Sequence, residues 1–110
     1  MGCVLMITIK DYEAILEEAR ELVERKNNDY AGEKDFLANF RMAEMMGLNP
    51  STGVLLRISD KFARICQLVQ KEANVPEESI HDTLIDLMNY SALMILCLKD
   101  EEARRKKIVD

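Results

Sequence analysis

The stretch that most constrains the fold is residues 79–98, because its pattern predicts one long helix. Apolar residues recur along it every three or four positions, which places them on one helical face. They are Ile80, Leu84, Leu87, Met88, Met94, Ile95 and Leu98. Ser91 interrupts this stripe, but its hydroxyl can donate to the Leu87 carbonyl and needs no functional role. We therefore expect this stripe to face a helical core.

The opposite face of the same predicted helix mixes polar and apolar residues. It carries Asp82, Asp86 and Asn89 in its first half and Leu93, Leu96 and Cys97 in its second half. The second half is thus apolar on nearly all sides, which predicts burial all round. Acids on an otherwise buried face need a cation, a metal ion or several hydrogen bonds. The rest of the chain should supply that partner.

The remaining pattern predicts three more helices and hence an all-α four-helix bundle in a single domain, residues 1–110. The first helix should span residues 9–27 with Thr8 as its N-cap, and the second residues 33–46. The third should begin near Pro50 and end near residue 72, and Ser79 should cap the fourth. Residues 1–8 form an arm, 9–98 the bundle, and 99–110 a charged C-terminal extension that continues the last helix or frays. Short connections are typical of a bundle.

Composition narrows the classes of function. The net charge of −5 argues against a nucleic acid or an anionic membrane as the main partner. The three cysteines have no metal-ligand spacing, so we interpret them as reduced thiols of a cytoplasmic protein. No segment has the length and hydropathy of a membrane span. A small anionic ligand remains compatible with this charge.

Acids of the fourth helix are the first candidates for chemistry. Asp82, Asp86 and Asn89 share one stripe with roughly 5–6 Å between neighbours, and oxygen ligands in this pattern suit Mg²⁺. Asp82 could equally complete a capping box with Ser79. Asp86 could instead form a buried ion pair with a base of the third helix.

The third helix offers Asp60 next to the bases Arg57, Lys61 and Arg64. An acid among cations could hold a metal while the bases hold phosphate oxygens. The same pattern also fits a solvated face with an Asp60–Arg64 pair.

The end of the first helix supplies two further candidates. Lys26 and Tyr30 continue its apolar stripe towards the core, where they could either cap the helix or close over a ligand.

The order and spacing of these motifs resemble the nucleotide-modification-associated domain, a small helical family often found in phages. The motifs are Lys26-Asn-x-Asp29-Tyr30, Asn39-Phe40, Arg57-x-x-Asp60-Lys61-x-x-Arg64 and Asp82-Thr-Leu-x-Asp86-Leu-x-Asn89-Tyr90. The layout of that family is similar to all-α nucleoside triphosphate pyrophosphatases of the MazG and dimeric dUTPase type. In those enzymes two neighbouring helices hold Mg²⁺ through EExxE and ExxD acids. Here Asp60 stands where EExxE is expected, and Asp82 and Asp86 are four residues apart where ExxD needs three.

Residues and resemblance together lead to one hypothesis, the Mg²⁺-dependent hydrolysis of a (deoxy)nucleoside triphosphate to monophosphate and pyrophosphate. The metal ligands would be Asp60, Asp82 and Asp86, with Asp60 and Asp86 as catalytic residues. The substrate-binding residues would be Lys61, Arg64, Lys26, Tyr30 and Asn89. We also expect a homodimer or homotetramer with Leu93, Leu96 and Cys97 at or near an interface.

Two alternatives remain open at this point. One is a non-enzymatic helical module that binds a nucleotide or a protein, in which Asp60 and Asp86 form ion pairs with bases of the third helix. The other is a plain oligomeric scaffold that binds neither nucleotide nor metal.

Overall fold

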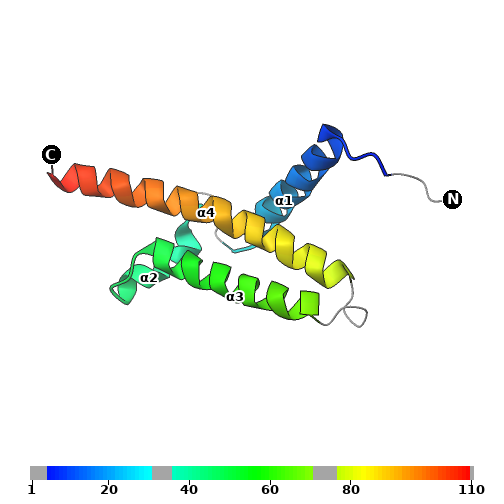
Figure 1. Ribbon diagram of the computed structural model, residues 1–110. Helices are drawn as coiled ribbons and strands as arrows, with labels where there is room; N and C mark the ends of the chain where they lie inside the picture. The colour runs from blue at the N-terminus through cyan, green and yellow to red at the C-terminus, as the bar shows by residue number, and fades with distance from the viewer. Residues whose placement is uncertain (1–4, 31–35, 71–76, 110) are drawn as a thin grey trace.

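The structure, a computed structural model, describes residues 5–30, 36–70 and 77–109, with side chains except at residues 28–30, 77–79 and 109. This part of the chain is all-helical, which confirms the predicted fold class (Figure 1). Its elements are α1 (Ile9–Tyr30), the 3-10 helix η1 (Ala38–Phe40), α2 (Met42–Met45), α3 (Pro50–Gln70) and α4 (Glu77–Val109).

The longest element, α4, runs for 33 residues, which is about 50 Å of helix. It begins at Glu77, so the prediction of Ser79 as its N-cap is wrong. It also continues past residue 98 to Val109, so residues 99–109 belong to the helix. Of the two outcomes expected for the charged extension, the structure shows the continued helix.

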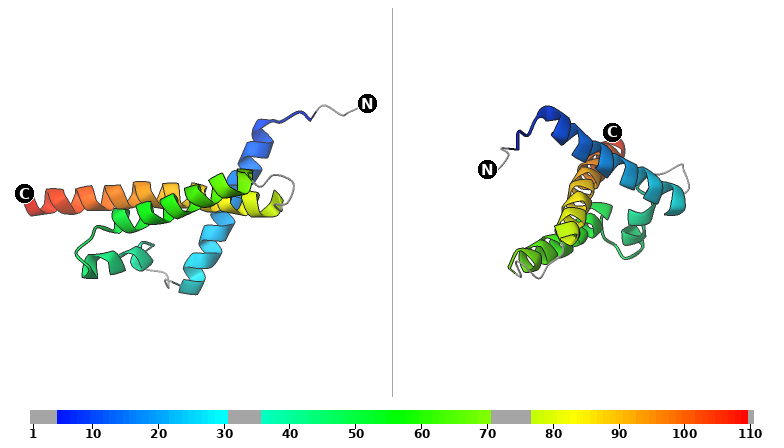
Figure 2. Two further views of the ribbon diagram at one scale, coloured as in Figure 1. Left: turned by 60° about the horizontal axis from the view of Figure 1, so that its bottom comes forward. Right: turned by 90° about the vertical axis from the view of Figure 1, so that its right-hand side faces the viewer.

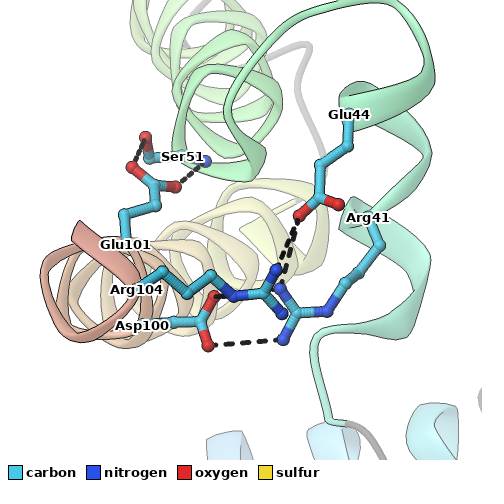
Figure 3. A network of polar contacts seen from close by, with 6 residues as sticks. All are labelled: Arg41, Glu44, Ser51, Asp100, Glu101 and Arg104. Atoms are coloured by element: carbon cyan, nitrogen blue, oxygen red, sulfur yellow. Dashed lines mark hydrogen bonds and ion pairs between the residues drawn. The ribbon is translucent and has the colours of Figure 1, made fainter. Parts of the chain in front are cut away.

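A network of polar contacts fastens the last third of α4 to the elements before it (Figure 3). Arg41 donates to Asp100 at 2.9 Å, and Arg104 contacts the same carboxylate at 3.1 Å. Glu101 accepts hydrogen bonds from the backbone N–H of Ser51 at 2.9 Å and from its hydroxyl at 2.8 Å. These contacts explain why a charged segment stays helical, because its acids have partners in α3 and next to α2.

The segment before α3 differs from the single helix expected over residues 33–46. It contains η1 and the four-residue α2, and residues 31–35 lie outside the described part. Gly47 ends α2 with φ of 76°. The N–H groups of Gly47 and Leu48 then bond the carbonyls of Glu44 and Ala43, both at 3.0 Å. This is a Schellman motif, which needs a residue that adopts positive φ easily.

The four helices do not all run side by side. α3 and α4 lie side by side and antiparallel, while α1 crosses α4 steeply (Figure 2). The buried cluster sits between α3, α4 and the turn that precedes α2. Its members are Leu37, Val54 and Cys97, packed against Phe40, Ile58, Tyr90, Leu93 and Met94.

The two faces of α4 have roles partly opposite to those the sequence suggested. Leu84, Ile95 and Leu98, predicted to be core, are 44%, 55% and 50% exposed. Cys97 is completely buried within the chain, so its side chain is not available for direct contact with another subunit. An interface near Leu93 and Leu96 stays a prediction. Burial and the nearby carboxylates Glu101 and Asp100 raise the pKa of its thiol. Since the second half of α4 is apolar on both faces, periodicity alone could not decide which face meets α3.

Candidate functional site

A cleft of about 650 Å³ opens between α1, α4, the first half of α3 and the η1–α2 segment. Its polar lining residues are Lys26, Asn27, Asn39, Arg57, Asp86 and Asn89. Its aromatic lining residues are Phe36, Phe40 and Tyr90. Two cations and one carboxylate line it, so its lining is net positive in a chain of net charge −5. Such a cleft suits an anion that also carries a flat ring.

Asp86 lies in the third turn of α4 and lines the cleft. Its side chain is 21% exposed. Its Oδ2 lies 3.0 Å from Nζ of Lys61 on α3. Its Oδ1 lies 3.7 Å from Nζ of Lys26 on α1. One carboxylate thus links three helices, which is the ion-pair arrangement that the sequence left open for Asp86.

Asn89 lies one turn further along the same stripe of α4. Its Nδ2 donates to the backbone carbonyl of Ala19 at 3.1 Å. Ala19 is 5% exposed and marks the crossing of α1 and α4, where a small side chain lets the helices approach closely. A second polar contact joins the same helices, with His81 Nε2 2.8 Å from Glu18 Oε1. Asn89 therefore positions α1 against α4 as well as lining the cleft.

The other acids predicted to hold a metal lie elsewhere. Asp60 and Asp82 are exposed and do not line the cleft. Because α4 begins at Glu77, the capping box suggested for Asp82 with Ser79 as N-cap does not apply. Within the described ranges, no three acidic, histidine or cysteine side chains are grouped as a metal site.

A divalent ion in the cleft would therefore meet a single carboxylate, Asp86, which already contacts two ammonium groups. The described side chains do not by themselves fit a Mg²⁺ site, since hard cations take six or more oxygen ligands. Oxygens of a bound phosphate would have to supply much of the coordination.

The predicted substrate-binding residues are divided between the cleft and its surroundings. Lys26 and Asn89 line the cleft, and Lys61 reaches its edge through Asp86. Arg64 is exposed on α3 outside the lining. The side chain of Tyr30 lies outside the described residues, although α1 continues through its backbone, three residues beyond the predicted end.

Several lining residues were not among the predicted site residues. Arg57, which the sequence offers as a neighbour of Asp60 and as a possible ion-pair partner of Asp86, lines the cleft. Asn39, Phe40 and Tyr90 also line the cleft, and they belong to the motifs that carry the family resemblance. Those motifs are the sequence signal that could have identified them. For Phe36 the sequence held no signal, because a lone aromatic residue normally indicates core.

Comparisons of the chain with known protein families, with curated proteins and with solved structures found no match. The resemblance described above therefore stays a prediction. No helix in the described ranges is both long enough and apolar enough to cross a membrane.

Proposed function

We propose that this protein binds a nucleoside phosphate in the cleft. The observation that supports this most directly is that cationic and aromatic side chains from separate elements line one cavity of about 650 Å³. That volume lies within the range of about 300–1,000 Å³ typical of small-molecule sites.

The phosphate would lie against Arg57 and Lys26. A guanidinium can hold phosphate oxygens in a bidentate manner, while an ammonium acts as a point charge. Lys61, 3.0 Å from Asp86, stands beside them as a third cation. The base would lie against Phe40 or Tyr90, and stacking on an aromatic ring contributes about 1–3 kcal/mol per base. The amides of Asn27 and Asn39 offer both donors and acceptors for base edges.

Calorimetric titration with each deoxynucleoside triphosphate, monophosphate and free nucleoside tests this proposal. We expect affinity to rise with phosphate number and to fall at least tenfold in Arg57→Gln. Arg64→Gln is a matched control, because Arg64 is an exposed arginine of the same helix that does not line the cleft. Equal losses in both variants, or no binding of any nucleotide by the wild type, would contradict the proposal.

A second candidate function is Mg²⁺-dependent hydrolysis of a nucleoside triphosphate. The position of Asp86 at the cleft, next to the cations, favours it. In this version Asp86 is the acid at the cleft, since Asp60 and Asp82 are exposed outside its lining, and the fold is proposed to be MazG-like. The test is pyrophosphate release from each triphosphate with and without Mg²⁺. Pyrophosphate release that is lost in Asp86→Asn would support hydrolysis. Tight nucleotide binding with no pyrophosphate release at any Mg²⁺ concentration would support the non-enzymatic binding module instead.

The proposal extends to assembly and location. We propose a homodimer or homotetramer that works in the cytoplasm, where nucleotides are abundant. Free thiols at Cys66 and Cys97 are consistent with a reducing compartment.

A further inference from the structure

The α3–α4 pair carries a second feature that nucleotide binding does not explain, a row of uncovered apolar side chains on each helix. On α3 these are Leu55, Phe62 and Val69, which are 52%, 61% and 60% exposed and seven residues apart. On α4 they are Leu84, Ile95 and Leu98, at 44%, 55% and 50%. We call these six residues the open face.

Both rows lie on the same side of the helix pair. On α3, Val54 is buried and Ile58 packs beside it. At about 100° per residue, the three open-face residues of α3 lie roughly 40–80° further round than the midpoint of these two. On α4, Cys97 and Met94 pack against α3. The three open-face residues of α4 lie roughly 70–130° further round than the midpoint of these two, in the same rotational sense. The two helices are antiparallel (Figure 1) and face each other. Rotations in the same sense therefore bring both rows to one side of the pair.

The cleft lies on the other side of the pair. Arg57 on α3 and Asp86 on α4 are each displaced from the buried positions in the opposite rotational sense. Material that covers the open face therefore leaves the cleft accessible.

The chain exposes more surface than a compact monomer of the same mass would. The chain exposes 8873 Å², whereas a compact monomer of its mass exposes about 6,200 Å². Its radius of gyration is 17.5 Å, against about 13 Å for a compact domain of this length. The surplus of about 2,700 Å² belongs to the whole elongated chain, and it exceeds the roughly 800 Å² that each partner buries in a standard interface.

We propose that the open face is the contact surface for a second copy of this chain. An isologous interface places the same patch on both subunits, and two rows of Leu, Ile, Phe and Val can pack on their own copies across a two-fold axis. The α3–α4 pairs of the two subunits then form a four-helix layer with the two clefts on its outer sides. The six side chains of the open face are uncharged, so their direct contacts across the axis pair no like charges.

Sedimentation equilibrium with Phe62→Glu tests this surface. The wild type should have twice the 12.6 kDa chain mass at micromolar concentration, and Phe62→Glu should raise the dissociation constant at least a hundredfold. Leu56→Glu is the matched control, because Leu56 is also 61% exposed on α3 but lies away from the open face. It should leave the dimer intact.

A second measurement covers the case in which Phe62→Glu fails to fold. Val69→Ala is milder and should raise the dissociation constant about tenfold with unchanged helical circular dichroism. Cys66, an exposed thiol between Phe62 and Val69 on α3, should react with a maleimide more slowly in the wild type than in the dissociated variant. A wild type that stays monomeric at all concentrations, or a dimer broken by Leu56→Glu and not by the open-face variants, overturns the proposal.

Discussion

Asp86 illustrates how much of this protein depends on where single charges lie. Its carboxylate contacts ammonium groups from α1 and α3 while it lines the cleft. The side chains of Asp86 and Lys61 are 21% and 28% exposed, which places their ion pair between the surface and the buried class. Surface pairs contribute about 0–1 kcal/mol, whereas removing one partner of a buried pair costs about 3–5 kcal/mol.

The first prediction concerns this pair. Asp86→Asn and Lys61→Met should each lower the free energy of unfolding by roughly 1–2 kcal/mol. Asp86→Asn leaves Lys61 without its counter-charge, and Lys61→Met leaves Asp86 with only the more distant Lys26. The double variant should lose less than the sum, with a coupling energy of about 1 kcal/mol from urea unfolding. Strict additivity would show that the two side chains do not interact in solution.

The second prediction concerns pH. The hydrogen bond and charge of Arg41, with the charge of Arg104, hold the pKa of Asp100 below its usual value. A lowered folded-state pKa means that the native state prefers the ionised carboxylate, so its contribution is present at neutral pH and is lost as pH falls below about 4. The stability difference between wild type and Asp100→Asn should therefore be larger at pH 7 than at pH 3. A difference that does not change between these pH values would contradict the assignment.

At the scale of elements, the start of α3 depends on a residue 50 positions away. Pro50 is in the first turn, and Ser51 gives its N–H and hydroxyl hydrogen bonds to Glu101 of α4. A carboxylate at a helix N-terminus satisfies free N–H groups and favours the helix dipole. The contact also fixes where α4 lies along α3, and so which α4 residues face the cleft.

The third prediction follows from this contact. Glu101→Ala should lower the free energy of unfolding by about 1–2 kcal/mol, because buried Ser51 loses both acceptors. Glu102→Ala is the control, since Glu102 makes only an exposed pair with Lys106 at 3.6 Å in the described structure, and should change stability by less than about 0.5 kcal/mol. Chemical denaturation of both variants measures the difference. Similar losses would mean that helix propensity, and not the cap, is responsible.

At the scale of the whole molecule, the cleft and the open face occupy opposite sides of the α3–α4 pair. Two sites couple only if both ligands discriminate between the same two states of the protein. The cleft lining and the open face share no residue, so we expect nucleotide binding and assembly to be independent.

The fourth prediction tests that independence. Phe62→Glu, if folded, should bind nucleotide within about twofold of the wild-type affinity by calorimetry. By reciprocity, saturating nucleotide should leave the wild-type dissociation constant unchanged in sedimentation. A shift in either quantity would show that the two sides of the helix pair communicate.

Local sequence chemistry was sufficient for the all-α class and for the approximate positions of α1, α3 and α4. These features depend on periodicity over ten or more residues, which each segment carries by itself. Residues 33–46 were less predictable, because α2 is four residues long and its end is fixed by Gly47. Short elements carry too few periods for their pattern to be decisive.

Only the tertiary structure decided which side of α4 is buried, since Leu84 and Cys97 are equally apolar and differ only in what packs on them. It also decided that Asp86 faces two lysines while Asp60 and Asp82 stay exposed, because helix crossing sets the distances between side chains of different elements. A sequence fixes the angular position of a residue on its own helix. The position of the neighbouring helix follows from packing summed over the whole chain, and that sum is not readable from any one segment.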